Sequence, residues 1–211
     1  MPFITKQLLR KRAEHNEGLL TDLEEISLHQ EELERIDDTL GLTCKHLKIL
    51  YLQNNIIFKM ENLQHLKELE YINLALNNVS KIEGLQNCEF LKKIDLTVNF
   101  VDLDELESKF ELNAYLHICH NNSVIIGSMN HLVPLDRLRD MYMMGNPCQT
   151  KWPGFESYVL AKLPQLHTLD GKEITKSMQI IARQKLPQLE VLSFLIYFAH
   201  IVQLISCYLQ F

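Results

Sequence analysis

The sequence lacks the features that mark the common classes of enzyme and of nucleic-acid-binding protein. It contains no P-loop, no glycine-rich dinucleotide fingerprint and no nucleophile elbow. Positive charge is scarce, because 21 Lys and Arg residues face 27 Asp and Glu residues and leave a net charge of −6. Binding to a phosphate backbone needs clustered Lys and Arg side chains, so the charge balance argues against nucleic acid as a ligand. We therefore predict no catalytic residues and no cofactor.

Paired cysteines and a secretory signal are also missing. The five cysteines are odd in number and widely spaced, which argues against the disulfide framework of a small secreted protein. Residues 1–16 contain no unbroken apolar run and carry Lys6, Arg10, Lys11 and Arg12, a pattern typical of a helix and not of a signal peptide. We expect a reducing, cytoplasmic location.

Two clusters of polar residues contain metal-ligand types, and neither has the pattern of a metal site. His117, Cys119 and His120 are metal-ligand types, but on a strand only His117 and Cys119 share a face, whereas a structural zinc ion takes four ligands. The acidic run within residues 102–107 is more typical of a solvated loop than of a cation site. We predict no metal.

What the sequence does contain is a repeated apolar phrase. Its copies begin at Leu23, Leu47, Leu69, Leu91, Asn113 and Leu138, so that successive starts differ by 24, 22, 22, 22 and 25 residues. This is the period of a leucine-rich repeat. The sequence predicts an α/β fold, a right-handed leucine-rich-repeat solenoid of about six repeats over residues 21–148. A capping helix is expected in residues 1–20, a C-terminal repeat cap in residues 149–176 and an apolar helical tail in residues 177–211.

Each copy supplies one strand with an inward and an outward side. Because side chains alternate across a strand, Leu50, Ile72 and Ile94 are predicted to line one continuous interior row. No copy can bury its apolar side alone, so stacking against the next copy supplies the second layer.

Both ends of the array carry signals for caps. Thr5 is a predicted N-cap for a helix that continues to about His15 and ends at Gly18. At the other end, residues 155–162 have helical spacing, and a turn at residues 169–171 is expected to close the array.

An amide side chain recurs where each repeat turns away from its strand. Such a group can satisfy backbone N–H and C=O groups that the bend leaves unpaired. We interpret these residues as a structural ladder and not as a row of ligand-binding amides: Asn55, Asn77, Asn99, Asn121 and Asn146.

The outward strand positions form the predicted concave face, which is the best candidate for binding a partner. Exposed tyrosines provide large contact area and are enriched in binding hot spots, although in repeat proteins they also pack against one another. The candidate partner-binding residues are Tyr51, Tyr71, Asn73, Lys93, Asp95, His117 and Tyr142.

Several phrases go beyond a generic repeat and resemble the tilB family. They are the Glu-His-Asn of residues 14–16, LEEISLHQ of 23–30, LKILYLQNN of 47–55, YINLALNN of 71–78, IDLTVNF of 94–100, MGNPC of 144–148 and the closing LPQLHTLDGKEI of 163–174. The resemblance covers roughly residues 3–176. It implies a cytoplasmic adaptor, not an enzyme, that helps to preassemble axonemal dynein arms for motile cilia and flagella. The implied partners are dynein assembly factors, chaperones, a MYND zinc-finger protein and dynein subunits.

The sequence departs from that family in three places. The family has a coiled coil and a chaperone-type sandwich domain after the repeats, and we expect neither here. The family has one repeat fewer between residues 101 and 138; the surplus copy at 113–126 has Asn113 and Ser123 at apolar positions and should pack least well. Residues 191–211 contain no Asp, Glu, Lys or Arg.

Alternatives to the dynein-assembly interpretation stay open. For the tail they are a membrane anchor, which is not favoured, a helix packed on the cap or on another chain, and an end without evolved function. For the whole chain they are a phosphatase-targeting or ribonucleoprotein type of repeat module, a membrane-tethered variant, and an inactive truncated variant.

Overall fold

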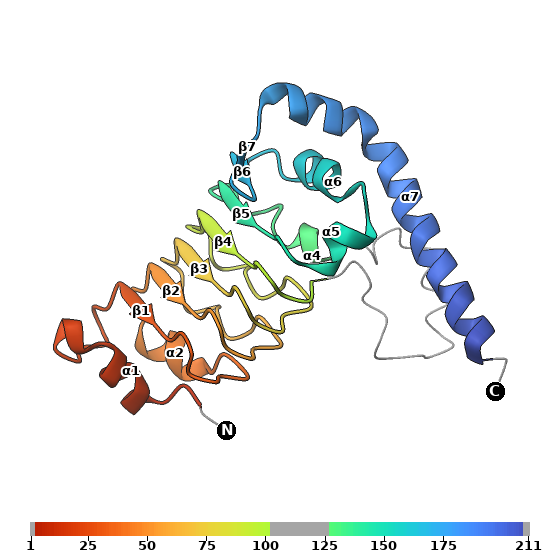
Figure 1. Cartoon of the computed structure of the whole chain (residues 1–211). Coiled ribbons are helices and arrows are strands. Elements are labelled where there is room, and N and C mark those ends of the chain that lie inside the picture. Colours follow the sequence, from red (N-terminus) through yellow and green to blue (C-terminus); the bar gives the residue numbers. More distant parts are fainter. Residues whose placement is uncertain (1–2, 102–126, 209–211) are drawn as a thin grey trace.

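A single sheet of short strands runs along the whole array. The computed structural model describes residues 3–101 and 127–208, with side chains described as far as residue 192. The strands follow one another in chain order (Figure 1). They are β1 (Glu25–Ser27), β2 (Ile49–Tyr51), β3 (Tyr71–Asn73), β4 (Lys93–Asp95), β5 (Asp140–Tyr142), β6 (Thr168–Leu169) and β7 (Lys172–Glu173). β1 to β6 pair in parallel, and β7 pairs antiparallel with β6. The predicted leucine-rich-repeat α/β solenoid is confirmed.

The interior of the array is built around one row of strand residues. In the register of the sheet, Leu50 pairs with Ile72 and Ile72 with Ile94, and all three are fully buried. Each such side chain contributes about 1.5–3 kcal/mol when it leaves water. The prediction of one continuous interior row is confirmed, and the row is longer than predicted: Ile26, Leu50, Ile72, Ile94, Met141 and Leu169.

One repeat was placed wrongly from the sequence. β4 pairs directly with β5, with Ile94 opposite Met141, so the sheet has no place for a strand between them. The phrase at residues 113–126 is therefore not the rung expected there, and it lies outside the described residues. A spacing of 22 residues cannot distinguish a rung from an insertion of similar length. The physical difference is the apolar content, because Asn113 and Ser123 would place polar groups at positions that the other copies bury.

The N-terminal cap forms largely as the sequence predicted. Helix α1 (Lys6–Arg12) has Thr5 as its N-cap, whose Oγ1 accepts a hydrogen bond from the Leu8 N–H at 3.1 Å. The helix ends earlier than expected, and a 3-10 turn η1 (Glu14–Asn16) follows it. Gly18 closes the cap with φ of +71°, and its N–H donates to the Ala13 carbonyl. Leu9 of α1 is fully buried, so the cap covers the open end of the core.

The other helices lie toward the two ends of the array, near β1 and β2 and beyond β4 (Figure 1). They are α2 (Asp38–Thr43), α4 (Gly127–Asn130), α5 (Pro147–Lys151), α6 (Phe155–Lys162) and α7 (Lys176–Tyr208). Helix α6 has the bounds that its spacing predicts. The predicted closing turn joins β6 to β7, with Asp170 and Gly171 both at positive φ, as a two-residue hairpin of the primed type requires.

The first part of α7 packs on α6. Ala182 and Leu189 are buried in the core, and the Lys162 ammonium lies 2.7 Å from the Glu190 carboxylate. Within the part of the chain that the structure describes, we find no helix with both the length and the apolarity needed to cross a bilayer. The alternatives for residues 191–211 depend on side chains from residue 193 onward, which lie outside this description.

Candidate protein-binding face

Two columns of outward-pointing side chains lie on the sheet, and together they form what we call the strand face. One column contains Ser27, Tyr51, Asn73, Asp95 and Tyr142, which occupy equivalent positions in β1 to β5. The other contains Glu25, Ile49, Tyr71, Lys93 and Asp140. All of these side chains are partly or fully exposed, whereas the residue between each pair is buried. The strand face is the predicted concave face.

The centre of the strand face is an aromatic row with a cation held in it. The rings of Tyr51 and Tyr71 meet edge to face, with centroids 5.7 Å apart. The Lys93 ammonium lies 4.8 Å from the ring centroid of Tyr71 and 5.0 Å from that of Tyr142. Both distances are within the range of a cation–π interaction. The row thus couples four side chains from four consecutive strands.

Asn73 and Asp95 perform the same local task in neighbouring repeats. The Asn73 Oδ1 accepts from the Ala75 N–H at 3.0 Å, and the Asp95 Oδ1 accepts from the Thr97 N–H at 2.9 Å. The Asn73 Nδ2 also donates to the Tyr71 hydroxyl at 3.1 Å. An amide and a carboxylate can therefore make the same hydrogen bond, and it does not require a charge. The carboxylate of Asp95 is a property of this one repeat.

The electrostatic environment of Tyr71 reflects this arrangement. Partial burial raises the pKa of the Tyr71 phenol, and the negative charge of Asp95 raises it further. The hydrogen bond from Asn73 acts in the opposite direction. The phenol stays neutral at physiological pH, so Tyr71 offers a partner an uncharged ring and hydroxyl.

The structure brings together six of the seven predicted partner-binding residues, since Tyr51, Tyr71, Asn73, Lys93, Asp95 and Tyr142 all lie on the strand face. His117 lies outside the described residues, and its expected place between Asp95 and Tyr142 is closed, because these two residues pair directly. Sequence reasoning missed Asp140, which pairs with Lys93. Counting two residues on from Leu138, as from Leu91 to Lys93, would have found it. Its carboxylate accepts from the Thr168 hydroxyl at 2.7 Å.

Behind the strand face, buried asparagines link each repeat to the next. Asn99 donates through Nδ2 to the carbonyls of Leu74 and Leu96 at 2.8 and 3.1 Å, and its Oδ1 accepts from the Val79 N–H at 2.9 Å. Asn55, Asn77 and Asn146 make equivalent bonds to their own repeat and to the preceding one. These asparagines satisfy backbone groups inside the core, as a structural role requires.

The ladder passes from Asn99 directly to Asn146. The Leu96 carbonyl accepts from both side chains, so no rung lies between them. Asn121 was expected at that place, and this is wrong; Asn121 itself lies outside the described residues. At the C-terminal end a carboxylate takes the place of a strand carbonyl, since the equivalent N–H group of Leu96 donates to the Tyr142 carbonyl. Asp170 Oδ1 accepts from the Met143 and Met144 N–H groups at 2.6 and 3.1 Å.

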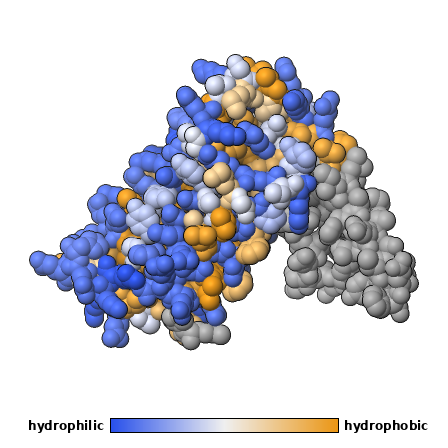
Figure 2. All heavy atoms as spheres, in the orientation of Figure 1, coloured by the Kyte–Doolittle hydropathy of each residue, from blue (hydrophilic) through white to orange (hydrophobic). Residues whose placement is uncertain are grey.

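A second surface feature lies on the loops that leave the strands. Hydrophilic residues cover most of the visible face of the array, but hydrophobic residues gather toward its middle (Figure 2). Leu76, Val98, Phe100 and Met144 are all exposed hydrophobic residues in consecutive repeats. Leu76 and Val98 also adopt positive φ, of 57° and 53°. For a β-branched residue such as Val98 this conformation is strained, and the other repeats have Asn54, Leu76 and Gly145 at the equivalent position, all with positive φ.

Metal-ligand side chains and thiols were the other candidate groups, and some of them lie in the described part of the chain. No cluster of three or more His, Cys, Asp or Glu side chains there could hold a metal ion. The acidic run within residues 102–107 and the group at residues 117–120 lie outside it. Cys44, Cys88 and Cys148 are buried. Burial raises the pKa of Cys44 to about 11 and that of Cys88 to about 12. Both thiols are therefore protonated at neutral pH and poorly nucleophilic.

Comparison with known proteins gives the family. Dynein axonemal assembly factor 11 of Xenopus laevis is 53% identical over 190 residues, which are 90% of this chain and 35% of that protein. Protein tilB of Drosophila melanogaster is 48% identical over 186 residues, which are 88% of this chain and 41% of that protein. The chain belongs to the tilB family. Dynein axonemal assembly factor 11 of Trypanosoma brucei brucei is 44% identical over 188 residues, which are 89% of this chain and 43% of that protein. No protein-family model matches.

Solved structures place this tilB-family chain among leucine-rich-repeat proteins by fold alone. A chain of the Drosophila melanogaster SNF/U2A′ complex superposes with a TM-score of 0.65 and 24% identity, covering 87% of this chain and 92% of that one. The leucine-rich-repeat domain of APL1B superposes with a TM-score of 0.50 and 15% identity, covering 80% and 42%. The chain spans well under half the length of the three tilB-family relatives named above.

Proposed function

We propose that this chain is a non-enzymatic protein-binding adaptor in the cytoplasmic preassembly of axonemal dynein arms for motile cilia and flagella. One observation carries the proposal. At 53% and 44% identity over about nine tenths of the chain, two of its relatives are named as dynein axonemal assembly factors. Their shared segment is a repeat array, so its contribution to assembly is expected to be binding.

The strand face supports an adaptor mechanism. A rigid backbone array holds Tyr51, Tyr71 and Tyr142 at fixed spacing, so a partner that covers them pays little side-chain entropy. The asparagine ladder stabilises the stack without using the exposed side chains. The buried side of each strand thus stabilises the fold, and the outward side is available for binding. The proposed partners are dynein assembly factors, chaperones and dynein subunits.

The test is co-purification from ciliating cells. A tagged chain carrying Tyr51→Ala and Tyr71→Ala should lose dynein assembly factors that the unaltered chain captures, because two central rings of the face are gone. The matched control is Phe58→Ala with Phe90→Ala, since these exposed aromatic side chains lie in loops outside β1 to β5. A Tyr51→Phe, Tyr71→Phe variant keeps the rings and should retain most of the binding.

The outcomes are distinct. Equal capture by the Tyr→Ala and Phe→Ala variants, with both folded by circular dichroism, would reject the strand face as the binding site. A chain that captures no dynein assembly factor or dynein subunit at all, beside a relative of full length that does, would reject the assembly role for this chain. This second comparison also tests the alternative of an inactive truncated variant.

A further inference from the structure

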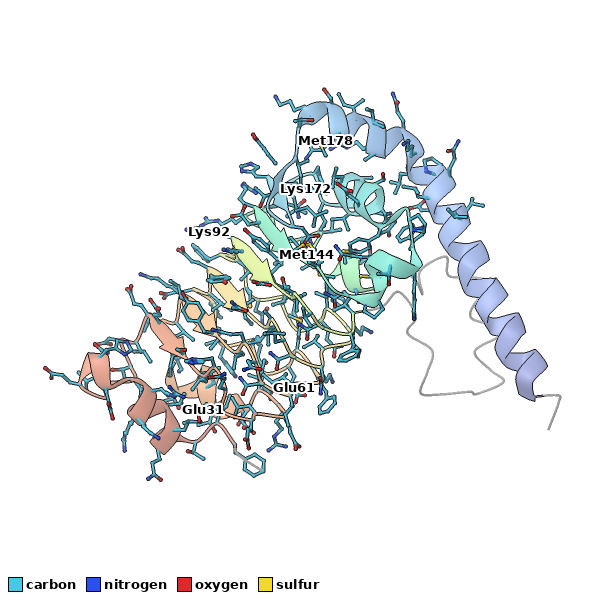
Figure 3. All side chains as sticks on the ribbon, in the orientation of Figure 1. Glu31, Glu61, Lys92, Met144, Lys172 and Met178 are labelled. Atoms are coloured by element: carbon cyan, nitrogen blue, oxygen red, sulfur yellow. The ribbon has the colours of Figure 1, made fainter. Side chains whose placement is uncertain are left out.

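The strand face has an unbalanced set of charges. Among the outward-pointing residues of β1 to β5, the carboxylates are Glu25, Asp95 and Asp140, and the only Lys or Arg is Lys93. On the adjacent flank Lys48 and Lys92 are each paired with a carboxylate, and Arg139 adds one positive charge whose N–H groups donate to backbone carbonyls, so the flank reduces the imbalance without removing it. The Lys92 ammonium lies 2.6 Å from the Glu70 carboxylate, beside β4 in Figure 3. A partner that covers this face therefore meets an excess of negative charge.

The single cation on the face shows what the tyrosines accept. Lys93 does not project freely but lies between the rings of Tyr71 and Tyr142 at cation–π distance from both. The chain's own ammonium thus occupies a position that an incoming cation could take. The rings of Tyr71 and Tyr142 border this position, and Asp95 lies on the same face of the same strand, two residues after Lys93.

We propose that the strand face binds a basic peptide segment of its partner protein. Arg or Lys side chains of that segment stack on Tyr71 and Tyr142 and pair with Asp95 and Asp140, while Lys93 competes for the same rings. This inference rests on the proposed function to the extent that the strand face is the partner site, and it specifies the chemistry of the partner. Arginine suits such a site because its planar group can stack on a ring while it hydrogen-bonds to a carboxylate.

Because Lys93 competes with the peptide, two substitutions should change the affinity for a basic peptide in opposite directions. Lys93→Met keeps the apolar stem but removes the competing charge, so affinity for a basic peptide should rise. Asp95→Asn removes an attracting charge, so the same affinity should fall. The fold tolerates this second change, because Asn73 makes the equivalent hydrogen bond in the preceding repeat. An acidic partner would reverse both signs.

The experiment measures fluorescence anisotropy with the full chain and two labelled probes, a short peptide of alternating arginine and alanine and its glutamate counterpart. We expect the arginine peptide to bind more tightly. Asp95→Asn should weaken it by about two- to fivefold, and Lys93→Met should strengthen it by a similar factor, the range that one exposed charge pair commonly gives. Both effects should shrink as salt is added.

Control variants separate a specific face from the overall acidity of the chain. Lys67→Met and Asp136→Asn make the same charge changes at exposed positions outside the strands. They should leave the affinity almost unchanged at moderate salt, where charges farther apart than about 10 Å are screened. Equal effects of the controls and the face variants would overturn the inference, as would a preference for the glutamate peptide.

Failure of this inference is distinguishable from failure of the proposed function. If the Tyr51→Ala, Tyr71→Ala chain loses its assembly factors but the arginine peptide is not preferred, the function stands and the basic-segment inference is wrong. If the arginine peptide binds with both predicted signs but no dynein assembly factor is captured from ciliating cells, the chemistry stands and the assembly role is wrong.

Discussion

The asparagine ladder allows a quantitative prediction for Asn99→Ala. The substitution removes one acceptor and one donor amide from the core while leaving the strand face intact. Its first consequence is an orphaned donor, because the buried Val79 N–H loses its partner, Asn99 Oδ1. Its second consequence is milder. The carbonyls of Leu74 and Leu96 each lose one bond but keep another, from Asn77 and Asn146 respectively.

These two terms set the magnitude. An unpaired buried N–H costs about 1–3 kcal/mol, and the weakened hydrogen bonding of two carbonyls adds about 1 kcal/mol, for a total loss of about 2–4 kcal/mol. For a domain of about this size, each kcal/mol corresponds to about 2–4 °C, so the melting temperature should fall by about 5–15 °C. Asn87→Ala is the matched control, because the Asn87 side chain is exposed and makes one long hydrogen bond of 3.4 Å.

The assay is urea unfolding followed by circular dichroism and by the fluorescence of Trp152, with binding of the arginine peptide measured in parallel. Asn99→Ala should lower the unfolding midpoint with little change in the denaturant slope, whereas Asn87→Ala should stay within about 0.5 kcal/mol of the unaltered chain. Peptide selectivity should be unchanged. Equal stability of the two variants would refute the structural ladder, and altered selectivity would indicate that the amides contact the ligand.

Three further predictions concern turns and charge. Gly84→Ala should destabilise the chain much more than Gly171→Ala, although both glycines have a positive φ of about 75°. The reason is that a Cβ at position 84 would lie 2.5 Å from a backbone carbonyl oxygen, whereas one at position 171 would meet nothing within 4 Å. Similar melting temperatures would contradict this. Val98→Asn should raise the free energy of unfolding by about 1 kcal/mol by relieving the strained left-handed backbone, as urea titration would show, and a loss of stability would count against it. Asp95→Asn should lower the pKa of Tyr71, whose raised pKa is due first to burial and then to this carboxylate, in an NMR titration with ring-labelled tyrosine. Stability falls with rising pH between the pKa of the unfolded phenol and the raised pKa of the folded one, so in this variant the loss in alkali should be smaller and should end at lower pH. An unchanged pKa would argue that Asp95 lies elsewhere.

Local patterns explain how much of the fold was predictable. The strand alternation that puts Leu50 inside and Tyr51 outside depends only on neighbouring residues. The N-cap at Thr5 and the bounds of α6 likewise follow from short-range preferences. Six of the seven candidate binding residues could be assigned to one face for the same reason, since each lies at a fixed offset from the start of its repeat.

Which repeats are neighbours could not be read in this way. The phrase at residues 113–126 has the right period, yet β4 hydrogen-bonds to β5. Strand pairing brings together segments that are far apart in the sequence. The strand that pairs with β4 is the one that can bury its apolar side chains and satisfy the buried amides of the ladder. This pairing places Tyr142 beside Lys93 and makes Asp140 part of the strand face.

The sequence by itself determined that this protein is a stack of repeats with an apolar interior, an asparagine ladder and tyrosines on the outward side, because each of these depends on spacing within a repeat. Only the tertiary structure decided that the Lys93 ammonium lies between two tyrosine rings and that Val98 has a strained backbone. The contact between Lys93 and Tyr142 joins two strands that are far apart in the sequence, and the positive φ of Val98 comes from a turn whose shape is common to Asn54, Leu76 and Gly145. Sequence spacing alone predicts neither the contact nor the backbone angle.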